Sequence, residues 1–277
     1  MNMITFSTLA CPHWQIETVI TKAAEYGYDG IEWRGGSQGH VQPDMPAAKR
    51  SFIRERCSHA GLSSIAVTAY TGFVSDSVKE RKLNLDELKR YVELAAELGA
   101  AHVRTFLGEL PEGRKPTSTI YANILDCLNS ASKYAASAGV KIAIEPHDDF
   151  VRSATITPIL SQNTSHPALC VIWDLGNTFA AGEAPAAGFD LLKDHIGYVQ
   201  VKDGKGRSPN WQLCALGQGD VPLAEAFELL RTNGYQGAFS VEWEYAWHSE
   251  LDPPEIALPS ALRTMRELLS AAQRESA

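Results

Sequence analysis

Short apolar segments alternate regularly with longer segments of helical periodicity along the chain. The short segments are bounded by polar turns, which is typical of buried strands. Between them, apolar residues recur every three or four positions, which predicts helices that bury one face. Strands are expected at Ile4–Thr8, Gly30–Trp33, Ser64–Thr68, His102–Phe106, Lys141–Ile144, Leu169–Trp173, Gly197–Val201 and Ala238–Trp243. Helices are expected at Ile16–Tyr26, Pro46–Ala60, Leu85–Leu98, Thr117–Ala138, Ile156–Ser161, Ala187–Lys193, Leu223–Thr232 and Glu255–Ala272.

This alternation predicts that residues 1–277 fold as a single (β/α)₈ TIM barrel of the α/β class. Five glycines support the assignment, because each ends a helical segment just before a strand, where a left-handed cap is favoured. They are Gly27, Gly61, Gly99, Gly139 and Gly234. The main alternative is an open doubly wound sheet, which requires a glycine-rich phosphate-binding turn after the first strand. The segment Leu9–Pro12 contains no glycine.

Composition and charge exclude several classes of function. The formal net charge is −8 and no basic stripe is present, which argues against a nucleic-acid partner. The five cysteines are widely spaced and odd in number, which predicts free thiols in a reducing compartment. No apolar segment is long enough to span a membrane, and the N-terminus lacks the basic region of a signal peptide. We therefore expect a cytoplasmic protein without a membrane partner. The sequence is compatible with either a monomer or a homo-oligomer.

Polar residues that can bind a metal occur at four successive strand ends, where function gathers in such barrels. Glu145 directly follows the fifth strand segment and Asp174 directly follows the sixth. Gln200 lies near the end of the seventh, and Glu242 lies in the eighth. Because parallel strands bring their carboxyl ends to one face, we expect these four side chains to converge on one point.

A divalent cation is the simplest explanation for acids in these positions. Carboxylates within apolar strands are unfavourable unless positive charge compensates them, and these strands hold almost no lysine or arginine before Lys202. Oxygen ligands favour hard ions, so we expect Mn²⁺ or Mg²⁺, with Zn²⁺ or Co²⁺ as alternatives. Zinc prefers histidine or cysteine, which are absent from the four positions. Alternatively, each acid belongs to an ordinary hydrogen-bond network at the barrel mouth.

Two basic residues and a histidine are further candidates. Arg104 lies inside the fourth strand, where a buried arginine must pair, so it either supports Glu145 or binds substrate. His147 follows the fifth strand and is either a substrate contact or a plain turn residue. Lys202 adjoins the seventh strand and is a candidate to bind substrate. It opens the cationic, glycine-rich segment Lys202–Arg207, which is either a phosphate site or a solvated loop.

Other residues beside the strand ends have structural alternatives. Glu32 and Arg34 either face the mouth of the barrel or form salt bridges with neighbouring residues. Trp33, Trp173 and Trp243 flank candidate site residues, and we expect them mainly to pack against the core.

Several motifs together resemble the sugar-phosphate isomerase/epimerase family, whose members have a xylose-isomerase-like TIM barrel. They span essentially the whole chain and are Gly27–Trp33, Ala143–His147, Trp173–Asn177, Val199–Asp203, Leu216–Pro222 and Ser240–Glu242. The resemblance implies that Glu145, Asp174 and Glu242 bind the metal. Gln200 takes the place of a fourth ligand that is commonly histidine in this family. The resemblance also implies that His147 and Asn177 lie near the substrate.

The resemblance implies a metal-dependent isomerase or epimerase that acts on a small sugar, keto-acid or sugar phosphate. The metal would polarise a carbonyl, and Glu145 and Glu242 would move a proton at the neighbouring carbon through an enediolate intermediate. Loss of a β-hydroxyl would instead give dehydration, so a lyase of dehydroshikimate or keto-polyol type is the alternative. An apurinic endonuclease shares the barrel, but a net charge of −8 argues against it. A non-catalytic sugar-binding barrel is the last alternative.

Overall fold

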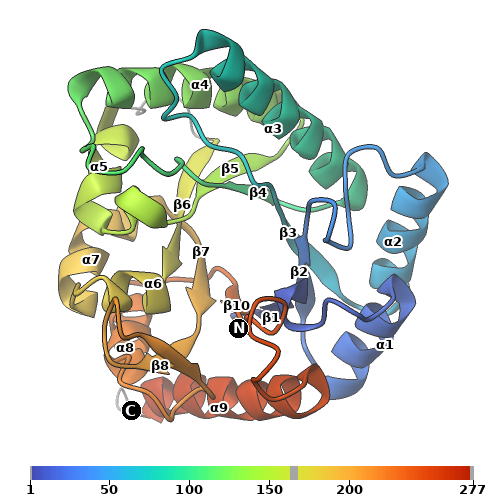
Figure 1. Ribbon diagram of the computed structural model, residues 1–277. Helices are drawn as coiled ribbons and strands as arrows, with labels where there is room; N and C mark the ends of the chain where they lie inside the picture. Colours follow the sequence, from blue (N-terminus) through green and yellow to red (C-terminus); the bar gives the residue numbers. More distant parts are fainter. Residues whose placement is uncertain (1, 163–167, 275–277) are drawn as a thin grey trace.

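The computed structural model describes residues 2–162 and 168–274, and this part of the chain forms a closed barrel of eight parallel strands surrounded by helices (Figure 1). The strands are β1 (Ile4–Ser7), β2 (Gly30–Arg34), β3 (Ser63–Thr68), β4 (His102–Thr105), β5 (Lys141–Ile144), β6 (Leu169–Asp174), β7 (Ile196–Val201) and β10 (Phe239–Val241). They follow one another around the barrel in chain order, and β10 pairs with β1 to close it. The predicted (β/α)₈ barrel is confirmed. The ends of the predicted domain, residues 1 and 277, lie outside the described residues.

The predicted helices are also present around the barrel (Figure 1). They are α1 (Ile16–Tyr26), α2 (Ala47–His59), α3 (Val78–Leu98), α4 (Ser118–Ser137), α5 (Ser153–Gln162), α7 (Pro185–Leu192), α8 (Leu223–Thr232) and α9 (Pro254–Arg274). The five glycines that were expected to end helices have φ between 70° and 88°. This is the left-handed region that a helix-ending glycine occupies most readily.

Alternate strand residues face the inside of the barrel, and this alternation places the polar residues at its mouth. In β7, Val199 and Val201 pack in the large core between strands and helices. Tyr198 belongs instead to a small separate cluster with Ile172 and other residues of the barrel interior. Because side chains alternate along a strand, Gln200 lies on the same inner side as Tyr198. The aromatic rings of Trp33, Trp173 and Trp243 are buried in the large core, as expected.

Helix α3 begins seven residues earlier than predicted. The Ser77 hydroxyl accepts a hydrogen bond from the backbone N–H of Glu80 at 3.3 Å, and Ser77 caps the helix. A serine followed three residues later by glutamate is a capping-box pattern. The apolar periodicity becomes visible only later, because the first two turns of α3 are mostly exposed.

One helix and one β-hairpin lie in segments for which the sequence predicts no regular element. Helix α6 (Leu175–Ala180) begins directly after β6, where Asp174 Oδ1 accepts the backbone N–H of Asn177 at 2.8 Å. Strands β8 (Asp203–Lys205) and β9 (Gln212–Cys214) form an antiparallel hairpin at the barrel mouth. The cationic segment Lys202–Arg207 is thus partly ordered as a strand.

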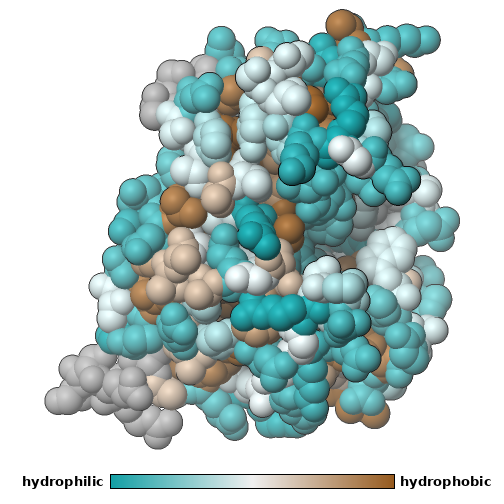
Figure 2. Space-filling model, turned by 60° about the vertical axis from the view of Figure 1, so that its left-hand side comes forward, coloured by the Kyte–Doolittle hydropathy of each residue, from teal (hydrophilic) through white to brown (hydrophobic). Residues whose placement is uncertain are grey.

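The surface carries hydrophobic residues that are scattered among hydrophilic ones on the face drawn in Figure 2. Among the described helices, none is both long enough and apolar enough to cross a membrane. The five cysteines are free, as predicted, and four of them are buried.

Asp203 holds the segment that follows β7 in place. Its side chain is buried, and Oδ1 accepts the backbone N–H groups of Gly204 at 2.9 Å and Val221 at 3.3 Å. Oδ2 accepts those of Gly217 at 2.8 Å and Gly219 at 3.0 Å. A Cβ at Gly219 would lie 2.1 Å from Asp203 Oδ1, so only glycine allows this close approach. One carboxylate therefore organises the β8–β9 hairpin and the turn after it.

Asp203→Asn should destabilise the protein by about 2–3 kcal/mol, because an amide NH₂ would replace an oxygen that accepts two buried N–H groups. Urea unfolding measures the change, and amide hydrogen exchange at Gly217 and Gly219 should become faster. Asp190→Asn is the matched control, because that side chain is 74% exposed and its ion pair with Lys193 lies at the surface. Equal stability of the two variants would contradict the anchoring role of Asp203.

Candidate active site

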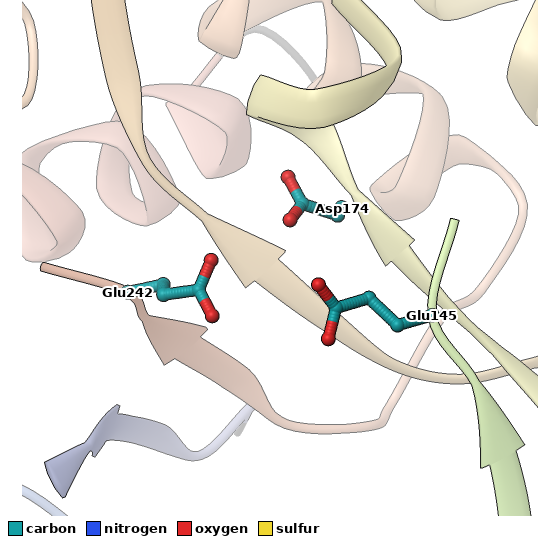
Figure 3. Close-up of side chains that lie close together, drawn as sticks. All are labelled: Glu145, Asp174 and Glu242. Atoms are coloured by element: carbon teal, nitrogen blue, oxygen red, sulfur yellow. The ribbon is translucent and has the colours of Figure 1, made fainter. Parts of the chain in front are cut away.

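Three carboxylates meet at the carboxyl end of the barrel. Glu145 follows β5 directly, Asp174 ends β6, and Glu242 follows β10 directly. One oxygen of each lies within 4.8 Å of the others, and the side chains point toward one another (Figure 3). Their exposed fractions are 3%, 0% and 7%, so water screens the repulsion between their charges only weakly. We call these three residues the carboxylate cluster.

Arg104 compensates part of the negative charge. It lies on β4, and its Nη1 atom is 3.1 Å from Glu145 Oε2. Its guanidinium lies 4.8 Å from the ring centre of Tyr70 and 4.1 Å from that of Phe106. These cation–π contacts fix the orientation of the arginine. Of the two roles left open by the sequence, the geometry favours support of Glu145.

Lys202 compensates a further part of the charge. Its Nζ atom lies 3.1 Å from Asp174 Oδ2, 2.5 Å from Glu242 Oε2 and 2.7 Å from Glu244 Oε1. Pairing of Arg104 with Glu145 was one of the expected alternatives, whereas the sequence did not indicate that Lys202 pairs with the acids. Since the ammonium is buried among three carboxylates, it is not free to bind a phosphate. Direct contact between Lys202 and substrate stays a prediction.

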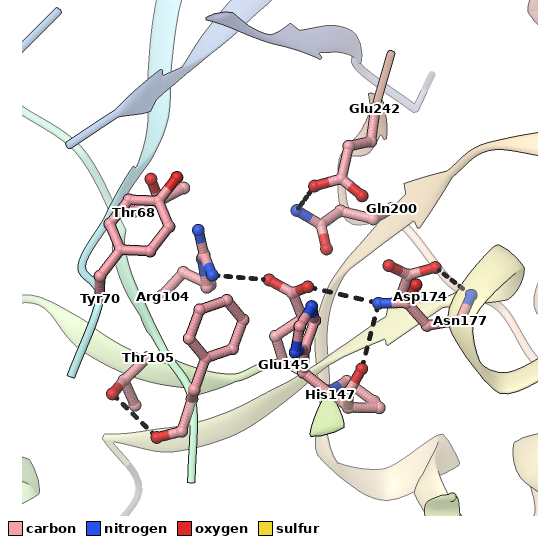
Figure 4. A network of polar contacts seen from close by, with 12 residues as sticks. Thr68, Tyr70, Arg104, Thr105, Glu145, His147, Asp174, Asn177, Gln200 and Glu242 are labelled. Carbon is pink, nitrogen blue, oxygen red and sulfur yellow. Dashed lines mark hydrogen bonds and ion pairs between the residues drawn. The ribbon is translucent and has the colours of Figure 1, made fainter. Parts of the chain in front are cut away.

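The Gln200 side chain also belongs to this site, and its orientation is fixed. Its Nε2 donates to Glu32 Oε1 at 3.0 Å and to Glu242 Oε1 at 3.3 Å. Its carbonyl oxygen is buried and has no hydrogen-bond partner among the described residues. In Figure 4 this oxygen points away from Glu242, toward the side where Glu145 and Asp174 lie. The amide therefore presents an unpaired acceptor to the carboxylate cluster.

Glu32 takes neither of the two positions that the sequence suggested. It is fully buried inside the barrel and accepts hydrogen bonds from the Tyr198 hydroxyl at 2.8 Å and the Ser240 hydroxyl at 2.6 Å. Arg34 points elsewhere and donates to the backbone oxygen of Gln38 at 3.1 Å. Glu32 thus forms a polar layer adjoining the carboxylate cluster.

Sequence reasoning missed this layer, although the signal was present. Tyr198 stands two positions before Gln200, and Ser240 stands two positions before Glu242. In a strand, residues two positions apart share a face. The inner face of β7 and β10 could therefore have been extended from the two predicted ligands to these hydroxyl groups.

Burial is the main influence on the acids of the site. It raises the pKa of Glu32, Glu145 and Asp174 to about 7, and the negative charge of Glu242 adds to the rise in each. Arginine and lysine partners oppose this rise at the two cluster residues. The result is a group of carboxyls that are difficult to ionise together unless more positive charge is supplied.

The residues present fit a divalent cation. Two oxygens bound to one cation at about 2.1–2.4 Å lie at most about 4.2–4.8 Å apart, which matches the spacing in the carboxylate cluster. Within the described part of the chain, the cluster and Glu244 face two cations, Arg104 and Lys202, so full ionisation of these carboxyls would leave negative charge in excess. The unpaired oxygen of Gln200 supplies a fourth donor. A donor set made only of oxygen favours a hard ion.

His147 and Asn177 lie on the Glu145 side of the cluster. Asn177 Nδ2 donates to Glu145 Oε1 at 3.4 Å and to the Pro146 carbonyl at 3.2 Å (Figure 4). His147 Nδ1 lies 2.7 Å from Asp148 Oδ1. Burial alone lowers the pKa of His147, but this hydrogen bond and the nearby negative charges raise it above its ordinary value. Both residues line an adjoining cavity, which suits the predicted substrate contacts.

Comparison with known proteins identifies the family. A family model described as xylose isomerase-like TIM barrel matches residues 20–268. The chain belongs to this family. Fructoselysine 3-epimerase of Shigella flexneri is 25% identical over 284 residues, which cover 95% of this chain and 98% of that protein. These matches confirm the family that the motifs predicted.

Solved structures agree in fold. The structure of an L-ribulose 3-epimerase matches with a TM-score of 0.84 and 18% identity, covering 100% of this chain and 97% of that one. The structure of the IOLI protein with a binding zinc atom matches with a TM-score of 0.83 and 19% identity, covering 98% and 99%. At these identities, the likeness supports the fold alone.

The metal-free protein should become less stable as the pH rises from about 4.5 to 7. Glu32 has a pKa of about 7 in the folded protein and an ordinary value of 4.5, so in this window the folded state keeps a proton that the unfolded chain releases. Each such group lowers the free energy of unfolding by up to about 1.4 kcal/mol per pH unit. Glu32→Gln removes one titrating group and should make the decline shallower.

Urea unfolding between pH 4.5 and 7.5 in the presence of a chelator measures this difference. Glu112→Gln changes an exposed glutamate and should leave the slope as in the wild type. If Glu32→Gln also keeps the wild-type slope, Glu32 is not the buried, protonated acid that its surroundings indicate.

Proposed function

We propose that this protein is a divalent-metal-dependent epimerase or isomerase of a small sugar, working through an enediolate intermediate. The observation that carries the proposal is the unpaired carbonyl oxygen of Gln200, buried beside three carboxylates with an excess of negative charge. Two of the relatives support a sugar substrate, because they are named as 3-epimerases of fructoselysine and L-ribulose.

The carboxylate cluster and Gln200 would hold the cation through oxygen atoms. This donor set favours Mn²⁺ or Mg²⁺, and the zinc atom in the IOLI structure supports Zn²⁺ as an alternative, with Co²⁺ behind it. When bound, such a cation polarises a substrate carbonyl and makes the neighbouring C–H bond more acidic. Arg104 and Lys202 keep the carboxylates oriented through their ion pairs with Glu145, Asp174 and Glu242.

Glu145 and Glu242 are the residues that we assign to proton transfer. They follow β5 and β10, which β6 and β7 separate in the barrel, so the two carboxyls approach a bound substrate from different sides. One carboxylate accepts the proton from the carbon next to the carbonyl. The other, in its protonated form, returns a proton to the opposite face, after which the two acids have exchanged protonation states. Such a pair performs epimerisation.

Other outcomes begin with the same proton abstraction. Return of the proton to the adjacent carbon gives isomerisation, and loss of a β-hydroxyl gives dehydration. The products distinguish these outcomes, because an enone or aromatic product of dehydration absorbs in the near ultraviolet and an epimer does not. The same carboxylates therefore serve each reaction, and the position of the substrate above them decides which one occurs.

Incubation with ketoses in D₂O and Mn²⁺ tests the proposal. Wild-type protein should introduce deuterium at a carbon next to the ketone, as measured by NMR. Glu145→Gln and Glu242→Gln should each lower the exchange rate by at least about 10²-fold, because an amide cannot accept the proton.

Glu225→Gln, on the exposed side of α8, is the control and should exchange at the wild-type rate. Circular dichroism and thermal unfolding show whether each variant is folded. Near-wild-type exchange by a folded Glu145→Gln or Glu242→Gln variant would refute the proton-transfer assignment, and exchange that is indifferent to chelators would refute the metal.

Gln200→His should shift metal preference toward Zn²⁺ and Co²⁺, because an imidazole nitrogen suits these ions better than an amide oxygen does. Activity need not rise, since Glu32 is placed to accept a hydrogen bond from an amide and not from a ring. Calorimetric titration of both proteins with Mn²⁺ and Zn²⁺ measures the change. An unchanged ratio of the two affinities would mean that Gln200 is not a ligand.

A further inference from the structure

A cavity of about 500 Å³ adjoins the carboxylate cluster on the side of Glu145. It lies between the segment that follows β5, helix α6 and the β8–β9 hairpin, and His147 and Asn177 form the border that it shares with the active site. The cluster residues themselves are not part of its wall. We call this space the distal cavity, because a substrate that reacts at the carboxylates would reach it with its far end.

The volume of the distal cavity exceeds what the reacting carbons of a small sugar require. Pockets of about 300–1,000 Å³ accommodate whole drug-sized molecules. Here the space lies beside the reacting centre and not over it. This arrangement suits a substrate in which a further group is attached to the sugar.

Arg152 is the charged group in this wall that is free to bind such a group. No hydrogen bond or ion pair engages its side chain within the described residues. By contrast, Asp148 is occupied by His147 at 2.7 Å. Arg207, on the nearby hairpin segment, donates to the Phe179 carbonyl, and its guanidinium carbon lies 3.6 Å from the centre of the Phe179 ring. An unpaired guanidinium selects a planar or tetrahedral anion, which it binds through two hydrogen bonds.

The wall beside Arg152 is held in a defined shape. Asp148 has φ of 51°, and it is the non-glycine residue with positive φ within the described part of the chain. Backbone in this region is disfavoured for most side chains and persists where its surroundings fix it. The neighbouring Asp149 does so, because its Oδ2 accepts the backbone N–H of Leu110 at 2.7 Å. The hydrogen bond thus ties this segment of the wall to the segment that contains Leu110.

Trp211 forms an aromatic part of the wall. It reaches from the β8–β9 connection and packs against Phe179 at a ring distance of 6.2 Å. Val151 and two alanines of α6 and its end, Ala180 and Ala181, complete an apolar lining. A carbon chain or ring can lie against this lining while its charged end pairs with Arg152.

We propose that the distal cavity binds the far end of the substrate and that this end carries an anionic group, a carboxylate or a phosphate, which pairs with Arg152. The inference rests on the proposed function for the identity of the reacting end. Arg152 thereby replaces Lys202 as the candidate for anion binding, because Lys202 forms ion pairs with three carboxylates.

Direct binding tests the proposal independently of turnover. The probes are D-fructose, D-fructose 6-phosphate and the fructose–glycine conjugate, which are respectively neutral, phosphorylated and carboxylated. Calorimetry with Mn²⁺-loaded wild-type protein should find at least one anionic probe bound more tightly than D-fructose. The better of the two anionic probes identifies phosphate or carboxylate as the preferred group.

Arg152→Met should weaken binding of that anionic probe about 10- to 100-fold, the range expected for lost hydrogen bonds to a charged group, and should affect D-fructose much less. Arg152→Lys keeps the charge but not the two-pronged geometry, so it should recover part of the affinity. Arg56→Met, at an exposed position of α2, is the control and should bind all probes as the wild type does.

Equal affinity of wild-type protein for all three probes would overturn the proposal, and so would an anionic preference that Arg152→Met leaves intact. Deuterium exchange with the same probes reports separately on the proposed function. Selective binding without exchange would leave the anion site standing and refute the epimerase assignment. Deuterium exchange without selective binding would support the epimerase assignment and refute the anion site.

Discussion

The packing of several carboxylates into one dry space is the constraint on which this structure depends. A closed parallel barrel brings every strand end to one face, so Glu145, Asp174 and Glu242 meet although they are far apart in the chain. Their mutual repulsion is strong where water is excluded. The positive charges of Arg104 and Lys202 reduce this repulsion, and more than one contact holds each of the two side chains in place. The charge that these two leave uncompensated is the basis for proposing a divalent cation.

A layer of hydrogen bonds around Glu32 fixes how Gln200 is oriented beside the carboxylate cluster. Glu32 collects donors from Tyr198, Ser240 and Gln200 on the inner faces of β7 and β10. Because Gln200 uses its NH₂ group on carboxylates, its oxygen is left for the interior of the site. An amide that was free to rotate would present either end. Glu32 therefore orients the candidate ligand Gln200 by accepting a hydrogen bond from its NH₂ group. Residues that hydrogen-bond to metal ligands have the same effect in known metal sites.

The segments around the mouth of the barrel form the cavity beside the carboxylate cluster. The strands form the floor, whereas α6 and the β8–β9 hairpin build the walls on one side. Asp203 anchors the turn after the hairpin, and Asp149 anchors the segment after β5, each by accepting backbone N–H groups. This division fits the general behaviour of barrels, in which a common floor supports chemistry and variable loops select the substrate. The free guanidinium of Arg152 lies in such a wall.

The order of strands and helices, the closed barrel and the four polar strand ends could be predicted from the sequence, because apolar periodicity and helix-ending glycines are local properties of the chain. It missed the start of α3, where exposed turns hide the period, and the α6 and hairpin segments, whose order depends on caps and long-range anchors. The three-dimensional arrangement was needed to choose between the two roles of Arg104, to bring Lys202 to the acids and to place Glu32 inside the barrel. Those contacts join strands separated by many residues, and their strength comes from burial, which no single segment contains.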